Sequence, residues 1–440
     1  MINQKLKEFE SFFPKALIKK INGIVLIDKP IDHKKIILEL YDEIRDMNYS
    51  PSKCVGYLMI NKQNNVPRII PVLSAKDYFL YYFCIKILEK ELTEGRVKGT
   101  YGGWSMGNLI RKMEDQESLL LQSYGSLDSL NPYKWAKYWK QFQKKAYDFA
   151  QVSNKKCIVK FDIANFYNNI NLKKLKEKII LRISNNKKPV LDLLFFFLEN
   201  WDKKFSGYFP RNVGIPMDKI GDCSRILANF YLQEYDLNMR NLCEKYNTEY
   251  LRYADDILIY CKNQRIAKKI LFESSKFLLK LDLDINTGKV VFFNSKKEFN
   301  NYWAFEFFDI IGDGKDIKKL ELALKKMFRY KEEKIIFREN SVIKRILNSN
   351  FGGLDKRYLN RFIKYVLQES FFENLDYRQI AFIFNQLSPV QQQRMIKKIY
   401  SVIRKTNFNS CLYNLRKFLK MNAIDFNFEY INKKIELTLR

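Results

Sequence analysis

The spacing of hydrophobic residues changes along the chain, and each change indicates a different kind of element. The segment "CIVKFDI" at 157–163 is a mostly apolar run of the kind that forms a buried strand. The segment "SRILANFYLQEYDLNMRNL" at 224–242 repeats its apolar residues at the helical period, and "YLRYADDILIY" at 250–260 predicts two strands around a tight turn. Residues 155–310 therefore predict an α+β fold.

The flanking regions are mostly helical. A short extended segment after residue 63 passes into an amphipathic helix that begins near Lys76, and after "IGDGK" at 311–315 the chain is helical and basic. Gly and Pro are scarce, and no linker composition marks a boundary. We divide the chain into an N-terminal helical region, a central α+β region and an all-α C-terminal region whose paired helices suit a helical repeat: 1–60, 61–310 and 311–440.

Two local patterns predict details of helices. Ser388 is the expected N-cap of a helix, because Pro389 follows it and Gln391 completes a capping box. One further helix carries aromatic residues at i, i+3, i+4 and i+7, a spacing typical of core packing. These residues are Trp135, Tyr138, Trp139 and Phe142.

Charge points to an anionic partner. The 440 residues include 78 Lys and Arg against 49 Asp and Glu, a net charge of +29, which is typical of proteins that meet phosphate backbones or anionic surfaces. A general lysine-rich bias accounts for part of this excess. With 47% hydrophobic residues, the chain can also bury a sizeable core.

The rare residues exclude several kinds of chemistry. Seven cysteines, an odd number without a C-x-x-C pair, argue against disulfides and zinc knuckles and favour a reducing compartment. The only histidine, His33, leaves little room for histidine-dependent triads or metal sites, so a metal would be held by oxygen. No signal sequence or membrane-spanning stretch is visible, so we expect a cytoplasmic protein with no membrane partner.

Three aspartates form the candidate chemical site. Asp162 follows the buried strand, and Asp255 and Asp256 lie side by side in the predicted hairpin turn. Two adjacent carboxylates call for a cation, which is either a lysine or a metal ion, although Asp is also an ordinary turn residue. Carboxylates at strand ends suit Mg²⁺, and two such ions about 3.5–4 Å apart catalyse nucleotidyl transfer in polymerases.

Taken together, the motifs resemble the reverse transcriptase family. "FDIANFY" and "YADD" look like the two catalytic motifs of that family. Four further segments resemble its motifs in the same order: "RIIPVLSAKDYFLYYF", "GIPMDKIGDCSRILANFYLQEYD", "LDLDINTGKVVFF" and "YWAFEFFDI". The resemblance covers roughly residues 60 to 310 and implies right-hand polymerase fingers and palm, with an antiparallel sheet and packed helices.

The resemblance also implies roles for single residues. Asp162, Asp255 and Asp256 would be the catalytic residues and the ligands of Mg²⁺, or of Mn²⁺ in its place. Tyr167 would lie beneath the incoming sugar and exclude a ribose 2′-OH, although a core aromatic is an equally good interpretation of its position. The implied nucleotide-binding residues are Arg68, Tyr167, Gly214, Pro216 and Lys289, with Ser224 as the N-cap of the next helix.

The chain departs from the family pattern in places. Met217 and Asp218 replace the usual glutamine and glycine after the proline, and Trp104 and Asn108 stand where many members have arginines. Neither an RNase H acidic cluster nor a His/Cys endonuclease is visible. The helical C-terminal region in place of a conventional thumb resembles the abortive-infection and "unknown group" bacterial reverse transcriptases, which act in defence against bacteriophages.

The leading hypothesis is an RNA-directed DNA polymerase in antiphage defence that adds dNTPs to a 3′ or protein hydroxyl. The alternatives are a template-independent, protein-primed polymerase and a non-catalytic nucleic-acid-binding module; an RNA-dependent RNA polymerase fits Tyr167 poorly. The expected partners are template RNA or product DNA, with a dedicated noncoding RNA, a partner protein and a homo-oligomer left open. The 27 tyrosines are too many to identify a priming residue.

Overall fold

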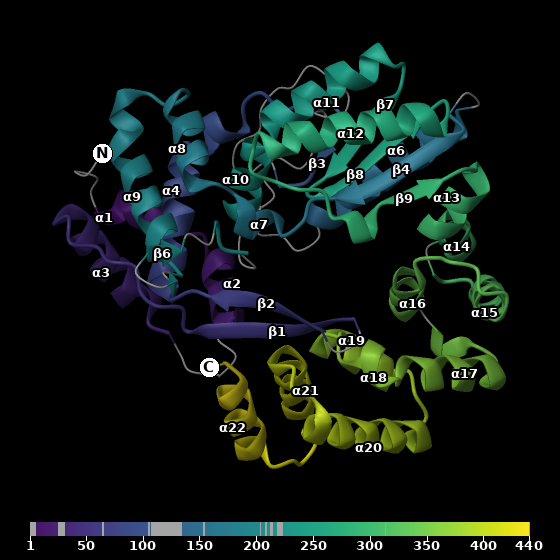
Figure 1. Ribbon diagram of the computed structural model, residues 1–440. Helices are drawn as coiled ribbons and strands as arrows, with labels where there is room; N and C mark the ends of the chain where they lie inside the picture. Colours follow the sequence, from purple (N-terminus) through teal and green to yellow (C-terminus); the bar gives the residue numbers. More distant parts are fainter. Residues whose placement is uncertain are drawn as a thin grey trace. The chain divides into compact units, whose positions relative to one another are not determined.

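The computed structural model describes residues 6–24, 31–63, 66–103, 106, 134–152, 155–202, 204–206, 209–211, 214–217, 223–312, 314–349 and 351–439. Its contacts group the chain into two compact units, Met1–Val55 with Ile70–Lys296, and Gly56–Ile69 with Lys297–Arg440. The predicted α+β fold with a helical C-terminal region is confirmed (Figure 1). The functional division at residues 60 and 310 stays a prediction.

A five-stranded sheet in the order β3-β7-β8-β4-β9 is the centre of the first unit. β3 runs parallel to β7, and the other neighbours are antiparallel. Every residue of β4 is buried, which explains its nearly continuous apolar sequence. The strands are β3 (Thr100–Tyr101), β4 (Cys157–Asp162), β7 (Glu249–Tyr253), β8 (Asp256–Cys261) and β9 (Val291–Phe293).

Helices cover both faces of this sheet. On one face lies α6 (Lys134–Gln151), whose Ala146 carbonyl accepts a hydrogen bond from the Tyr260 hydroxyl at 3.0 Å. The opposite face carries α11 (Gln233–Lys245), which contacts β7, and α12 (Gln264–Leu279), which contacts β4 and β8. Residues that pair directly across a ladder share a face, so the register places Lys160, Asp162 and Asp256 on the α6 face.

Among the remaining helices of the first unit, α3, α9 and α10 pack on α4. α4 begins at Ala75, one residue before its predicted start, because the Ser74 side chain accepts a hydrogen bond from the Asp77 backbone N–H at 3.1 Å. The others are α1 (Leu6–Ser11), α2 (Lys15–Ile24), α3 (His33–Arg45), α4 (Ala75–Thr93), α7 (Phe166–Asn169), α8 (Leu172–Ile180), α9 (Lys188–Asn200) and α10 (Cys223–Tyr231). A short two-stranded sheet joins β5 (Lys204–Ser206) to β6 (Phe209–Arg211).

The two local helix predictions have clear outcomes. The capping box at α20 is confirmed, because the Ser388 backbone N–H donates to Gln391 Oε1 at 3.1 Å. In the aromatic face of α6, Phe142 is fully buried and Trp139 packs edge-on against Tyr253, with ring centroids 4.9 Å apart. Trp135 and Tyr138 lie outside the residues whose side chains the structure describes.

The second unit is helical apart from its share of a two-stranded sheet, β1 (Gly56–Gln63) and β2 (Val66–Val72). The buried Asn409 connects this sheet to the helices. Its Oδ1 accepts from the Met59 N–H, and its Nδ2 donates to the Tyr57 carbonyl, both at 2.8 Å. The helices are α13 (Lys296–Trp303), α14 (Phe305–Ile311), α15 (Ile317–Glu332), α16 (Glu339–Leu347), α17 (Lys356–Val366), α18 (Glu369–Phe372), α19 (Tyr377–Asn385), α20 (Pro389–Lys405), α21 (Asn409–Met421) and α22 (Phe428–Leu439).

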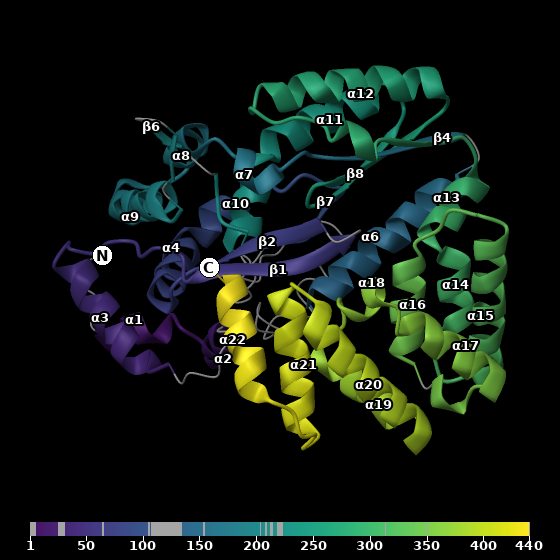
Figure 2. The same ribbon diagram turned by 60° about the horizontal axis from the view of Figure 1, so that its bottom comes forward.

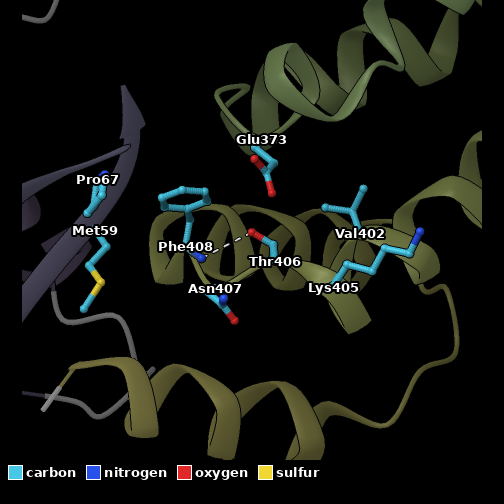
Figure 3. A pocket seen from close by; sticks show the side chains of 8 residues that line it. All are labelled: Met59, Pro67, Glu373, Val402, Lys405, Thr406, Asn407 and Phe408. Atoms are coloured by element: carbon cyan, nitrogen blue, oxygen red, sulfur yellow. Dashed lines mark hydrogen bonds between the residues drawn. The ribbon is translucent and has the colours of Figure 1, made fainter. Parts of the chain in front are cut away.

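The helices α20, α21 and α22 contact one another in chain order (Figure 2), whereas α14 also contacts α16, α15 contacts α17 and α19 contacts α21. A cavity of about 260 Å³ lies among β1, β2, Glu373 and the segment that joins α20 to α21 (Figure 3). Asn61 Nδ2 donates a hydrogen bond to the Glu373 carboxylate at 2.7 Å. Within the described ranges, no helix is both long enough and apolar enough to cross a bilayer.

Candidate active site

Three carboxylates meet at one end of the five-stranded sheet. Asp162 is the last residue of β4, Asp256 is the first residue of β8, and the two are register partners. Asp255 lies beside them in the turn, because Tyr253 pairs with Asp256 and only Ala254 and Asp255 connect the two strands. The structure therefore brings together the three aspartates singled out in the sequence.

The turn between β7 and β8 is strained. Ala254 has a φ of 53°, in the left-handed region, where a residue with a Cβ costs about 1 kcal/mol. Two-residue hairpin turns need positive φ and usually place Gly, Asn or Asp there. The Ala254 carbonyl accepts a hydrogen bond from Arg252 Nη1 at 2.7 Å. This bond fastens the turn that carries Asp255.

Arg252 is itself fixed by a buried ion pair. Its Nε and Nη2 donate to the two carboxylate oxygens of Asp236 on α11 at 2.7 and 2.6 Å, and both side chains are fully buried. Nη1 also donates to Asn229 Oδ1 at 2.8 Å, and the Tyr250 hydroxyl donates to Asp236 at 2.6 Å. Burial opposes the charge of Arg252, but Asp236 outweighs it and raises the pKa of the guanidinium. This network was not predicted from the sequence.

Two lysines pair with two of the three aspartates. Lys289 Nζ donates to Asp162 Oδ2, and Lys160 Nζ donates to Asp256 Oδ1 at 2.6 Å. Burial acts to lower the pKa of Lys289, but the hydrogen bond and charge of Asp162 raise it. The sequence left open whether a lysine or a metal ion balances these carboxylates, and in the structure lysines pair with two of them. One of these, Lys160, was not among the predicted site residues.

Asp255 has no ion pair with any described residue. Burial, followed by the negative charges of Asp256 and Asp162, raises its pKa from 3.8 to about 6. The metal-free site therefore carries a carboxylate that is costly to ionise, a feature found at many functional sites.

The loop that precedes β9 brings Lys289 to the carboxylates. The Asn286 N–H donates to the Asp162 carbonyl, and the Ala164 N–H donates to the Asp284 carbonyl, both at 2.8 Å. Lys289 follows at the end of a short 3-10 turn, Thr287–Lys289. Backbone pairing with the end of β4 thus sets the position of a residue that the sequence motif singled out.

Gly214 and Tyr167 lie against each other. The Ile215 N–H donates to the Tyr167 carbonyl at 3.0 Å, and Trp201 Nε1 donates to the Gly214 carbonyl at 3.2 Å. Gly214 has a φ of 67°, and a Cβ there would lie 2.2 Å from the Tyr167 carbonyl oxygen. Only glycine permits this approach. Pro216, two residues on, is buried.

Other predicted residues have different outcomes. Ser224 as an N-cap is wrong, because α10 already includes Cys223 and the buried Ser224 hydroxyl bonds with the Tyr81 hydroxyl at 2.9 Å. Arg68 is exposed on β2, in a segment that groups with the second unit, so its predicted role stays a prediction. Asp218, Trp104 and Asn108 lie outside the described residues.

The carboxylates fit a divalent cation in charge and chemistry. Asp162 Oδ1 is buried without a hydrogen-bond partner, and three carboxylates face two ammonium groups. Such hard oxygen donors suit Mg²⁺. In the described part of the chain, however, no three His, Cys, Asp or Glu side chains are grouped closely enough to hold a metal. The ammonium groups of Lys160 and Lys289 form ion pairs with two of the carboxylates. The assignment of the three aspartates as metal ligands therefore stays a prediction.

Comparison with known families points to polymerase chemistry. Residues 110–306 match the family model described as reverse transcriptase (RNA-dependent DNA polymerase), a range that contains all three aspartates and Lys289. This part of the chain is thus similar to a reverse transcriptase-type polymerase domain. No curated protein matches the chain.

Several solved structures are similar to the chain. Apo telomerase from Candida tropicalis shares 15% identity at a TM-score of 0.36 over 98% of this chain and 71% of that one. Its form truncated from the C-terminal domain shares 14% at 0.34, over 56% and 51%. A partial Cas6-RT-Cas1–Cas2 complex shares 16% at 0.30, over 63% and 43%. The chain spans about half the length of the truncated telomerase.

Asp236→Asn is expected to destabilise the protein by about 3–5 kcal/mol, because it leaves the buried Arg252 charge unpaired. Denaturant unfolding followed by circular dichroism measures this change. Glu244→Gln is the control on the same helix, since Glu244 pairs with Arg240 on the surface at 3.0 Å and such pairs contribute under about 1 kcal/mol. Equal losses in both variants would contradict a structural role for the buried pair.

Asp255→Asn is expected to stabilise the metal-free protein by about 1–3 kcal/mol at neutral pH, because it removes the carboxylate with the raised pKa. A raised folded pKa gives stability that is present below pH about 4 and lost as the pH rises through about 6, so the gain should vanish at pH 4. Unfolding in the presence of a chelator, between pH 4 and 7.5, measures it.

Asp282→Asn is the control for this experiment. The hydrogen bond from Lys174 lowers the pKa of Asp282, so this substitution should give no gain. A stability difference between Asp255→Asn and the wild type that is independent of pH would show that ionisation of the Asp255 carboxylate is not its cause.

Proposed function

We propose that this chain is a DNA polymerase of the reverse transcriptase type, which transfers deoxynucleotides from dNTPs to a 3′ hydroxyl or to a hydroxyl of a protein. The observation that supports this most directly is the meeting of Asp162, Asp255 and Asp256 with Lys289 at the ends of β4 and β8, within the range that matches the reverse transcriptase family.

Asp162 and Asp255 would hold two Mg²⁺ ions, with Mn²⁺ as a substitute, and these would supply an activated attacking hydroxyl and stabilise the leaving pyrophosphate. The unpartnered Asp162 Oδ1 and the uncompensated charge of Asp255 support this assignment. The resemblance assigns Asp256 to the metal site as well, but Asp256 differs from the other two in its pairing with the buried Lys160.

The surrounding residues would bind the nucleotide. Lys289 is 46% exposed, so its ammonium group can leave Asp162 and bind the triphosphate as a point charge. Tyr167 would lie beneath the sugar, with its backbone held by the loop of Gly214 and Pro216. Arg68 would add a planar donor fork for phosphate oxygens.

We further propose that the polymerase copies RNA, acts in the cytoplasm and serves defence against bacteriophages. The net charge of +29 supports a nucleic-acid partner, and a dedicated RNA, a partner protein or a second copy of the chain would suit it too. The seven cysteines are all free thiols, which supports a reducing compartment. The helical region from Lys296 onward supports the likeness to defence-associated members of the family.

Asp162→Asn is expected to reduce nucleotide incorporation by about 100-fold or more, because it removes charge stabilisation at the reacting centre. Purified protein is supplied with Mg²⁺ and labelled dNTPs, with and without an RNA template and primer, before and after nuclease treatment. Asp192→Asn is the control, since Asp192 forms a surface ion pair with Lys176 on α8. Full activity of Asp162→Asn would overturn the site assignment.

The same assay separates the two polymerase hypotheses. Incorporation that requires the template supports RNA-directed synthesis, whereas label that stays on the protein without a template supports protein-primed, template-independent synthesis. Nucleic-acid binding without any incorporation would support the non-catalytic module and overturn the proposal.

Tyr167→Ala is expected to raise incorporation of ribonucleotides relative to deoxynucleotides by about tenfold or more, because a steric contact with the 2′-OH is lost. Tyr167→Phe keeps the ring and should keep the discrimination. Competition between labelled rNTP and dNTP measures the ratio, and unchanged discrimination in Tyr167→Ala would return Tyr167 to the role of a core aromatic.

A further inference from the structure

The second aspartate of the hairpin pair has a partner of its own. We infer that Asp256 is the permanent counter-ion of Lys160 and not a metal ligand, so that Asp162 and Asp255 alone hold the metal ions. This inference rests on the proposed polymerase function and deepens it, because it makes Lys160 a positioning residue that decides which carboxylates remain available.

The position of Lys160 carries the argument. Lys160 lies in the fully buried strand β4, between β8 and β9, two residues before Asp162, and it is 5% exposed. Because side chains alternate along a strand, Lys160 and Asp162 share a face, and the register places Asp256 opposite Asp162 on that face. A diagonal contact across the ladder therefore brings Lys160 Nζ to Asp256 Oδ1 at 2.6 Å.

Lys160 cannot easily give up this partner. The Lys160 side chain is only 7% exposed, and Asp256 is the one carboxylate among the described residues that pairs with it. An ammonium group left unpaired in such a place is strongly disfavoured. A divalent cation bound to Asp256 would also lie beside this ammonium group and be repelled by it.

Lys289 behaves differently, although it too pairs with an aspartate. Its side chain is 46% exposed on a short turn. The ammonium group of Lys289 can therefore move away from Asp162 into solvent and does not become a buried, unpaired charge. Asp162 keeps a second oxygen, Oδ1, that is buried without a hydrogen-bond partner. The ion pair of Lys289 with Asp162 can thus be broken when a cation binds, whereas that of Lys160 with Asp256 cannot.

The charge balance of the site agrees with this division. The positive charge of Lys160 neutralises the negative charge of Asp256. Once Lys289 moves away, Asp162 and Asp255 are the two carboxylates whose charge is available to a cation. Asp255 has no ion pair among the described residues, so it needs no release at all. The site then presents two carboxylates, which is enough for ions that complete their coordination with water and substrate phosphates.

The test measures Mn²⁺ binding to the full chain without nucleotide, by the electron paramagnetic resonance signal of free Mn²⁺. The central variant is Lys160→Met with Asp256→Asn, which removes both members of the pair and leaves the net charge of the site unchanged. We expect its Mn²⁺ affinity to stay within threefold of the wild type, whereas Asp162→Asn should lose tenfold or more.

A loss in the double variant as large as that in Asp162→Asn would make Asp256 a ligand and overturn the inference. The matched control is Lys176→Met with Asp192→Asn, a second charge-neutral exchange of a Lys–Asp pair in the same unit, joined at 3.0 Å. Its affinity should equal that of the wild type. Thermal unfolding of each variant confirms that the chain is folded.

A second exchange keeps the test decisive if the first double variant unfolds. Lys160→Gln with Asp256→Asn retains hydrogen-bonding groups on both sides of the pair, and the same two outcomes apply to it. Failure of the proposed function has a different signature: Asp162→Asn would then bind Mn²⁺ as the wild type does, whatever the double variant shows.

Discussion

The candidate active site depends on one buried ion pair, that of Arg252 with Asp236. The guanidinium connects α11, through Asp236, to α10, through Asn229, and to the turn of the hairpin, through the Ala254 carbonyl. A fixed donor fork of this kind tolerates little displacement. Because Arg252 also donates to the Ala254 carbonyl, this ion pair supports the strained turn that carries Asp255 beside the end of β4.

The site is also a balance of opposing charges. Three carboxylates at one sheet end repel one another, and the ammonium groups of Lys160 and Lys289 each pair with one of them. Asp255 has no such partner among the described residues, and burial, followed by the negative charges of Asp256 and Asp162, raises its pKa. Stability is thus lowered at the place where a cation is expected to bind, a common compromise between stability and function.

Much of this arrangement was predictable from the sequence. The strand "CIVKFDI", the hairpin and the three aspartates were identified because periodicity and motif order are local signals. The structure pairs Lys289 with Asp162, whereas the predicted role of Lys289 in binding the nucleotide stays a prediction. Lys160 was missed because a lysine inside a strand, among 78 basic residues, has no local mark of burial. Ser224 was misassigned because its partner, Tyr81, is 143 residues away.

The placement of β1 has a consequence for how the protein is made. β1 and most of β2 precede the sheet of the first unit in the chain, yet they group with helices of the second, and Met59 bonds to Asn409, 350 residues later. At roughly 5–20 residues per second, a ribosome needs on the order of half a minute to complete that interval. During synthesis, the backbone groups of β1 that bond to Asn409 therefore have no such partner until α21 is made. In a nascent chain that stalls before α21, this strand edge would be open to mispairing.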